Sequence, residues 1–177
     1  QLGDIDLSVS RTNDAETVGT YTGVLAISQT AEALEALYTN YSFTVGKGNF
    51  EITAATFTVD DIENVVYNGS EQKQSVVVKN GEKELNAETD YDVTYSEDAT
   101  NVGTVTVTIT GKGNFAGTEI VKTYNITKRL VTITVANDTK VYDTADPDFA
   151  DATMRNNVAG ELGDIDLSVS RTNDAET

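Results

Sequence analysis

The residues with the clearest potential chemistry are three aspartates in the run 143–148, namely Asp143, Asp146 and Asp148. Several carboxylate oxygens in one turn are the hard ligands that Ca²⁺ prefers. The run lacks the Asp/Asn ladder, central glycine and distant glutamate of an EF-hand loop. The alternative is a solvated turn whose aspartates bond to nearby backbone groups. The sequence therefore predicts these three aspartates as candidate metal ligands, with Ca²⁺ as the cofactor to consider.

Two further acidic pairs, Asp4 with Asp6 and Asp90 with Asp92, stand at alternate positions, so each pair shares one face of a strand. They are read as exposed strand positions, with a metal as the alternative. Close carboxylates also serve glycosidases. With 29 acidic residues in a chain of 177, however, such pairs are expected from abundance alone.

The chain has no cysteine and no histidine. It therefore lacks a thiol nucleophile, a disulfide, the side chain best suited to proton transfer near neutral pH, and a Ser-His-Asp triad. The sequence predicts that the protein is not an enzyme.

The formal net charge is −17 at pH 7, with a pI near 4.1. Such a surface repels nucleic acid phosphates and anionic lipids. No apolar run approaches the roughly 20 residues that span a bilayer. We therefore expect no nucleic acid partner and no membrane insertion within this segment.

Stepwise comparison of the chain with itself shows an internal repeat. Residues 2–17 (LGDIDLSVSRTNDAET) recur letter for letter as residues 162–177, a period of 160 positions. Identity over this length indicates a tandem array rather than shared fold. The sequence then corresponds to one full repeat with a short overlap, and its ends fall inside a domain.

A fainter repeat lies inside this period. Val65–Asn68 resembles Lys140–Asp143, and Phe50–Thr53 resembles Tyr124–Thr127. Two homologous domains per period follow. The expected division is 1–56 as the C-terminal part of one domain, 57–128 as a complete domain, and 129–177 as the N-terminal part of the next.

Alternation of apolar and polar residues predicts strands, most clearly over 105–110, where the threonines should face outward. Further strands are predicted over 5–9, 74–79, 82–85, 91–96 and 118–127, with Asn80-Gly81 as a type I′ hairpin turn. An insertion at 28–38 carries strong helix formers and predicts one short helix. Tyr67, Tyr124 and Tyr142 are predicted in the core.

These elements predict an all-β fold of tandem Ig-like β-sandwich domains with one short helical insertion, with β-grasp-like repeats as the alternative. The joints between domains, 52–57 and 126–131, contain neither glycine nor proline. They should therefore allow little swing between neighbours.

The segment Val131–Phe149, continued through Leu162-Gly163-Asp164, Val18–Tyr21 and Asn40-Tyr41, resembles an MBG domain, a bacterial Ig-like module of large surface proteins. Asp143 replaces the glycine usual in that family. Residues 66–127, with Asp90–Tyr95 and Gly111–Phe115, are similar to a repeat of bacterial cell-wall-attached and secreted proteins. In such domains, strand lysines can form isopeptide crosslinks, for which Lys79 and Lys122 are candidates.

The resemblance implies an extracellular, cell-surface location and a role as a stalk or spacer of a bacterial adhesin or filament. The alternative is a multivalent adhesin module in which each copy binds a ligand weakly. The expected partners are neighbouring repeats of the same chain and, for the adhesin, a host or cell-surface glycan or protein.

Overall fold

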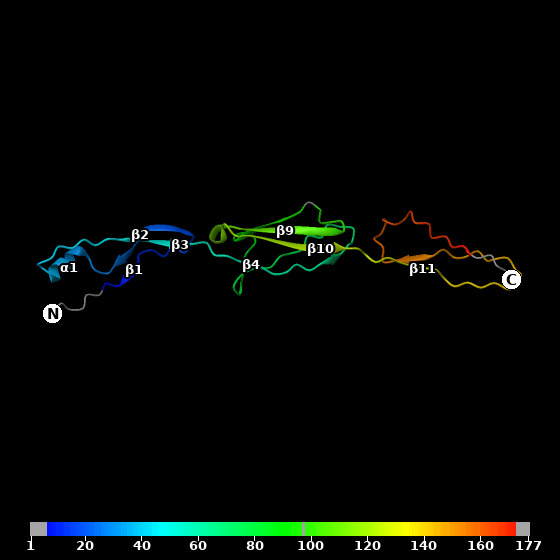
Figure 1. Cartoon of the computed structure of the whole chain (residues 1–177), viewed down its shortest axis with the longest axis horizontal. Helices are drawn as coiled ribbons and strands as arrows, with labels where there is room; N and C mark the ends of the chain where they lie inside the picture. Colours follow the sequence, from blue (N-terminus) through cyan, green and yellow to red (C-terminus); the bar gives the residue numbers. More distant parts are fainter. Residues whose placement is uncertain (1–6, 97, 173–177) are drawn as a thin grey trace. The chain divides into compact units, whose positions relative to one another are not determined.

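The structure, a computed structural model, describes residues 7–96 and 98–172 (Figure 1). It is mostly β, with several sheets and one short α-helix in the described part. The all-β prediction is therefore confirmed. Asp4 and Asp6 lie outside the described residues, as do the first residues of the strand predicted over 5–9.

The described residues form two compact units. The first contains the residues up to Asp60, together with Val76–Thr94 and Thr108–Val121. The second contains Asp61–Ser75, Tyr95–Val107 and the residues from Lys122 onward. The domain boundaries at 56 and 128 stay a prediction from the repeats.

In the first unit, an antiparallel sheet has the strand order β1-β2-β3. Its strands are β1 (Val9–Arg11), β2 (Gly19–Ile27) and β3 (Gly48–Ile52). Ser10 lies opposite Ala26, and Gly19 lies opposite Ile52. Between Tyr21 and Leu25 the register shifts, at Gly23, whose φ of 67° favours glycine.

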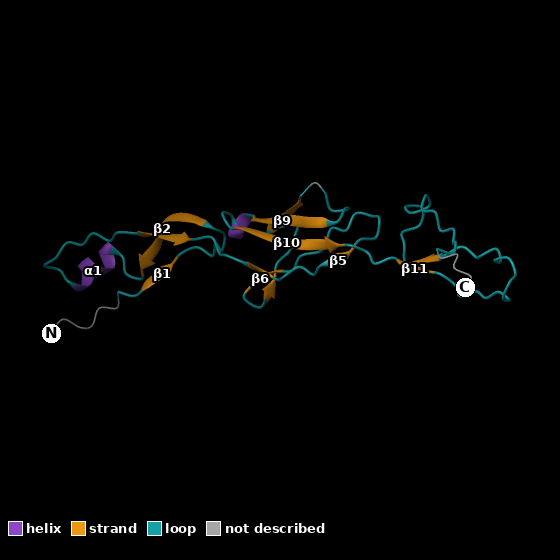
Figure 2. Ribbon diagram, turned by 45° about the vertical axis from the view of Figure 1, so that its right-hand side comes forward, coloured by secondary structure: helices purple, strands orange, loops and turns teal. Residues whose placement is uncertain are grey.

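The single described helix, α1 (Ala31–Leu37), confirms the helix predicted within 28–38. Thr30 caps it, because its side-chain oxygen accepts a hydrogen bond from the Ala33 amide at 3.2 Å. Leu34 faces inward and is 4% exposed. Figure 2 shows α1 at one end of the β1-β2-β3 sheet.

A four-stranded sheet has the order β5-β10-β9-β8. Its strands are β5 (Val65–Val66), β8 (Tyr91–Tyr95), β9 (Gly103–Gly111) and β10 (Glu119–Thr127). On β9, Val105, Val107 and Ile109 are buried while the threonines between them are not, as the alternation predicts. Burying each such side chain contributes roughly 1.5–3 kcal/mol.

The sheet β4-β6-β7 contains β4 (Thr58–Val59), β6 (Val78–Asn80) and β7 (Lys83–Glu84). Asn80 pairs with Lys83, so the two turn residues are Gly81 and Glu82 rather than Asn80 and Gly81. Gly81 has a φ of 57°, whereas Glu82 is not left-handed. This is the pattern of a type II′ turn, so the predicted type I′ turn is wrong by one residue.

A two-stranded sheet pairs β11 (Thr132–Thr134) with β12 (Thr153–Arg155), and a 3₁₀ turn, η1, covers Gly113–Phe115. Tyr124 is 1% exposed, as predicted for a core residue, and Tyr67 is half-buried. Tyr142 is 84% exposed, because it lies in a turn outside every described sheet. Its prediction as a core residue is wrong for this chain.

Each unit has its own buried side chains. In the first unit these are Leu34, Phe57, Val59, Val78, Leu85, Tyr91 and Ile109. In the second unit they are Ala99, Val105, Val107, Tyr124, Ile126 and Ala152.

Replacing Ile109 by alanine should lower the free energy of unfolding by about 2–5 kcal/mol, because Ile109 is fully buried and its loss leaves a cavity. The neighbouring exposed Thr110→Ala serves as the control and should change stability by less than about 0.5 kcal/mol. Urea denaturation measures both. Equal effects of the two substitutions would contradict the observed burial of this strand.

Candidate functional site

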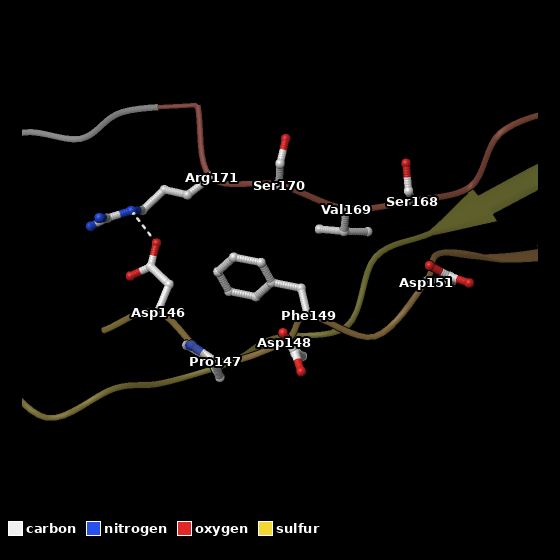
Figure 3. A pocket seen from close by; sticks show the side chains of 9 residues that line it. All are labelled: Asp146, Pro147, Asp148, Phe149, Asp151, Ser168, Val169, Ser170 and Arg171. Carbon is white, nitrogen blue, oxygen red and sulfur yellow. Dashed lines mark ion pairs between the residues drawn. The ribbon is translucent and has the colours of Figure 1, made fainter. Parts of the chain in front are cut away.

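The acidic run that sequence reasoning singles out is held by ion pairs. Asp146 is paired with Lys140 (Nζ–Oδ1 3.1 Å) and with Arg171 (Nε–Oδ2 2.9 Å). The second pair is drawn in Figure 3. Two protein cations therefore already neutralise the carboxylate that would be central to a metal site.

Asp143 occupies a turn and not a ligand cradle. Its φ is 64°, a left-handed conformation that aspartate tolerates better than most residues. The Thr144 amide and hydroxyl both donate to the Val141 carbonyl oxygen, at 3.2 and 2.7 Å, and close this turn. Lys140 Nζ donates to the Thr144 carbonyl oxygen at 3.0 Å.

Asp148 is exposed, and the structure does not bring it together with Asp143 and Asp146. Over residues 7–96 and 98–172, no three acidic side chains are close enough to share a cation. The geometry of the loop is thus that of a solvated turn with one ion-paired carboxylate, and the three aspartates stay candidate metal ligands from the sequence alone.

An open cavity of about 450 Å³ lies between residues 146–151 and residues 168–171. Figure 3 shows the ring of Phe149 between the two segments, with Val169 and Arg171 on the opposite side. One end is charged and the middle is apolar. The segment that closes the cavity belongs to the second copy of the duplicated sequence, since Ser168–Arg171 repeats Ser8–Arg11.

The other predicted acidic pair, Asp90 and Asp92, has separate partners. Asp90 accepts from the Asn86 amide at 2.9 Å, and this hydrogen bond is the main reason that its pKa lies below the usual value. Asp92 is paired with Lys112 Nζ at 2.8 Å. The two carboxylates brace local structure and show no shared ligand geometry.

The two candidate crosslinking lysines also form ion pairs. Lys79 Nζ lies 2.6 Å from Asp60 Oδ2, and Lys122 Nζ lies 2.7 Å from Asp61 Oδ1. The hydrogen bond from Lys79 to Asp60 raises the pKa of that lysine. A protonated amine is not a nucleophile, so the raised pKa of Lys79 works against its attack on a carboxyl group.

Hydrogen bonds at the two predicted joints are features that sequence reasoning missed. At the first, Asn114 accepts twice: its carbonyl oxygen from the Ala55 amide at 2.9 Å, and its Oδ1 from the Val18 amide at 3.0 Å. No local sequence pattern around Asn114 predicts these hydrogen bonds, because both join residues that are far apart in the sequence.

The second joint is held by a larger network. Arg129 donates to the Asn156 carbonyl oxygen at 2.6 Å, to Asn156 Oδ1 at 2.9 Å and to the Tyr67 carbonyl oxygen at 3.4 Å. Asn156 Nδ2 donates to the Leu130 carbonyl oxygen at 2.7 Å. The hydrogen bond from Tyr67 to Glu161 Oε1, at 2.5 Å, raises the pKa of Tyr67.

Three aromatic rings gather after α1. The centroid of Phe43 lies 6.2 Å from that of Tyr38 and 6.4 Å from that of Tyr41, which is 64% exposed. Glu35 on α1 holds their loop by accepting from the Phe43 amide at 3.0 Å. The close spacing of Tyr38, Tyr41 and Phe43 in the sequence could have predicted this cluster.

Comparisons with family models, curated proteins and solved structures found no match to this chain. In the described part of the chain, no helix has the length and apolar character needed to cross a membrane.

Adding millimolar Ca²⁺ should leave the melting temperature where salt of matched ionic strength leaves it, because Lys140 and Arg171 already pair with Asp146. Differential scanning calorimetry with Ca²⁺ and then with a chelator measures this. A rise that is specific to Ca²⁺ and disappears in Asp146→Asn would contradict the expectation and establish a cation site.

Proposed function

We propose that this chain is a structural spacer repeat of a bacterial cell-surface adhesin or extracellular filament. The observation that carries the proposal is the letter-for-letter recurrence of residues 2–17 at 162–177. A spacer tolerates recombination between near-identical copies, since changing the number of copies changes only its length.

The proposed domain is an Ig-like sandwich. Within residues 57–128 the chain supplies a four-stranded and a three-stranded sheet with mainly antiparallel pairing. Alternate residues of β9 are buried, as expected for a strand with one face in a core. The resemblance to MBG domains and related surface repeats, together with the acidic and cysteine-free composition, supports an extracellular, cell-surface location.

The hydrogen bonds at the two joints support a spacer that resists bending. Asn114 accepts a hydrogen bond from Val18 across the first joint. Across the second joint, Tyr67 donates to Glu161 and its carbonyl oxygen accepts from Arg129. Hydrogen bonds that involve a charged group contribute roughly 1.5–3 kcal/mol each when well formed. Joints held in this way should resist bending more than a glycine- or serine-rich linker does.

A second candidate function is a multivalent ligand-binding adhesin module. The aromatic cluster of Tyr38, Tyr41 and Phe43 favours it, because the exposed ring of Tyr41 can stack on a sugar or insert into a protein partner. Weak binding by each copy would then gain strength through avidity.

Loss of the second joint's network should increase bending between its flanking residues. Since the chain has no native cysteine, spin labels can be placed at introduced thiols on either side of residues 126–131. Electron–electron distance measurements should give a narrow distribution in the native chain and a broad one in Arg129→Ala. Arg155→Ala, on the exposed side of β12, is the matched control and should leave the distribution narrow.

A distribution in the native chain as broad as that of Arg129→Ala would contradict the spacer proposal. Binding of a defined glycan on an array, lost in Tyr41→Ala and kept in Arg129→Ala, would instead favour the adhesin module.

A further inference from the structure

The duplicated sequence occupies two different environments. Its first copy includes β1, which pairs with β2 at the edge of the β1-β2-β3 sheet. Its second copy, Leu167–Arg171, belongs to none of the described sheets and packs beside residues 146–152. Identical residues thus make one set of contacts at one end of the sequence and another set at the other.

The apolar side chains are more buried in the second copy than in the first. In the first copy Leu7 is 53% exposed and Val9 is 64% exposed. Their counterparts Leu167 and Val169 are half-buried. They line a second cavity whose apolar wall is formed by Ile133, Val135 and Ala152. The face that β1 leaves open is therefore the face that residues 133–152 cover.

The backbone edges are complementary as well. The Thr12 amide donates to the Val24 carbonyl oxygen at 2.8 Å, so the even-numbered residues of this strand point their hydrogen-bonding groups toward β2. In the second copy the Ala152 amide donates at 2.8 Å to the carbonyl oxygen of Leu167, the counterpart of Leu7. Odd- and even-numbered residues use opposite edges, so one strand could make both sets of bonds at once.

The four-stranded sheet contains a strand, β5, that has no equivalent among the described strands of the β1-β2-β3 sheet. There, β5 lies parallel to β10, with Val65 opposite Ile126 and Val66 opposite Thr127. Among residues 7–96 and 98–172, no strand takes the position of β5 in the β1-β2-β3 sheet. The sequence counterpart of Val65-Val66 is Lys140-Val141, and Val141 and Tyr142 are 74% and 84% exposed.

We propose that residues 129–161 of one molecule and residues 7–56 of a second molecule fold together as one domain. The strand at Leu7–Arg11 of the second molecule displaces the identical strand at Leu167–Arg171 of the first. Lys140-Val141 of the first molecule then pairs with the end of β3 in the second. Because the two contributing segments present different surfaces, the contact is heterologous, and the association is head-to-tail and open-ended.

This inference goes beyond the spacer function, since it concerns how separate copies associate. It predicts that the 177-residue chain forms a ladder of oligomers whose mass rises with concentration, measured by sedimentation velocity after a cycle of mild heating and cooling that allows strands to exchange.

Two matched variants, Val9→Lys and Val169→Lys, make the same substitution in the same local sequence and change the charge equally. Val9→Lys should abolish the ladder, because this lysine would have to enter the apolar cleft beside Ile133 and Ala152. Val169→Lys should keep or strengthen the ladder, because it weakens only the strand that is displaced. Far-ultraviolet circular dichroism confirms that both variants remain folded.

Thiols introduced by Leu7→Cys and Ala152→Cys should form disulfides between molecules, whereas Leu167→Cys with Ala152→Cys should form one within a molecule. Monomers at every concentration in the native chain and in Val169→Lys would overturn the proposal. So would oligomers that Val9→Lys leaves intact, or a disulfide from Leu7→Cys that closes within one molecule. None of these outcomes depends on the stiffness of the joints, so failure here is separate from failure of the spacer function.

Discussion

A β-strand has two edges that need hydrogen-bond partners and at least one face that needs apolar cover, and the rest of this structure depends on how those needs are met. Residues 57–128 meet them with two sheets in which Val78, Ile109 and Tyr124 are almost completely buried. Elsewhere the same needs are only partly met. β1 has one paired edge, and Val141 and Tyr142 belong to no sheet in the part of the chain that the structure describes.

The proposed division of each 160-residue period into domains accounts for this difference in burial and strand pairing. In the proposed division, residues 129–177 and residues 1–56 are parts of one kind of domain, and that domain is complete only where two periods follow one another. Copies of such a repeat depend on their neighbours for burial, as expected of arrays whose stability comes largely from nearest-neighbour interfaces. The hydrogen bonds from Val18 to Asn114 and from Tyr67 to Glu161 agree with this dependence, because each joins one proposed domain to the next.

Local features were predictable from sequence and long-range ones were not. The alternation at 105–110 and the helix formers at 31–37 determine structure within a few residues, and both predictions are confirmed. The turn at Gly81 was misplaced because strand register, not the Asn-Gly pair alone, decides which residues turn. The ion pairs of Asp146 join residues separated in sequence, and Tyr142 lacks the sheet that would bury it. No local pattern reports either fact.

The most direct measurement of the central claim is amide hydrogen exchange on a chain that carries two complete 160-residue periods, compared with the 177-residue chain. The account predicts that amides at Val141 and at Leu167–Arg171 exchange much more slowly where a following period supplies β2 and β3. Fast exchange at these positions in both chains would contradict it, because the domain halves would then not complete one another.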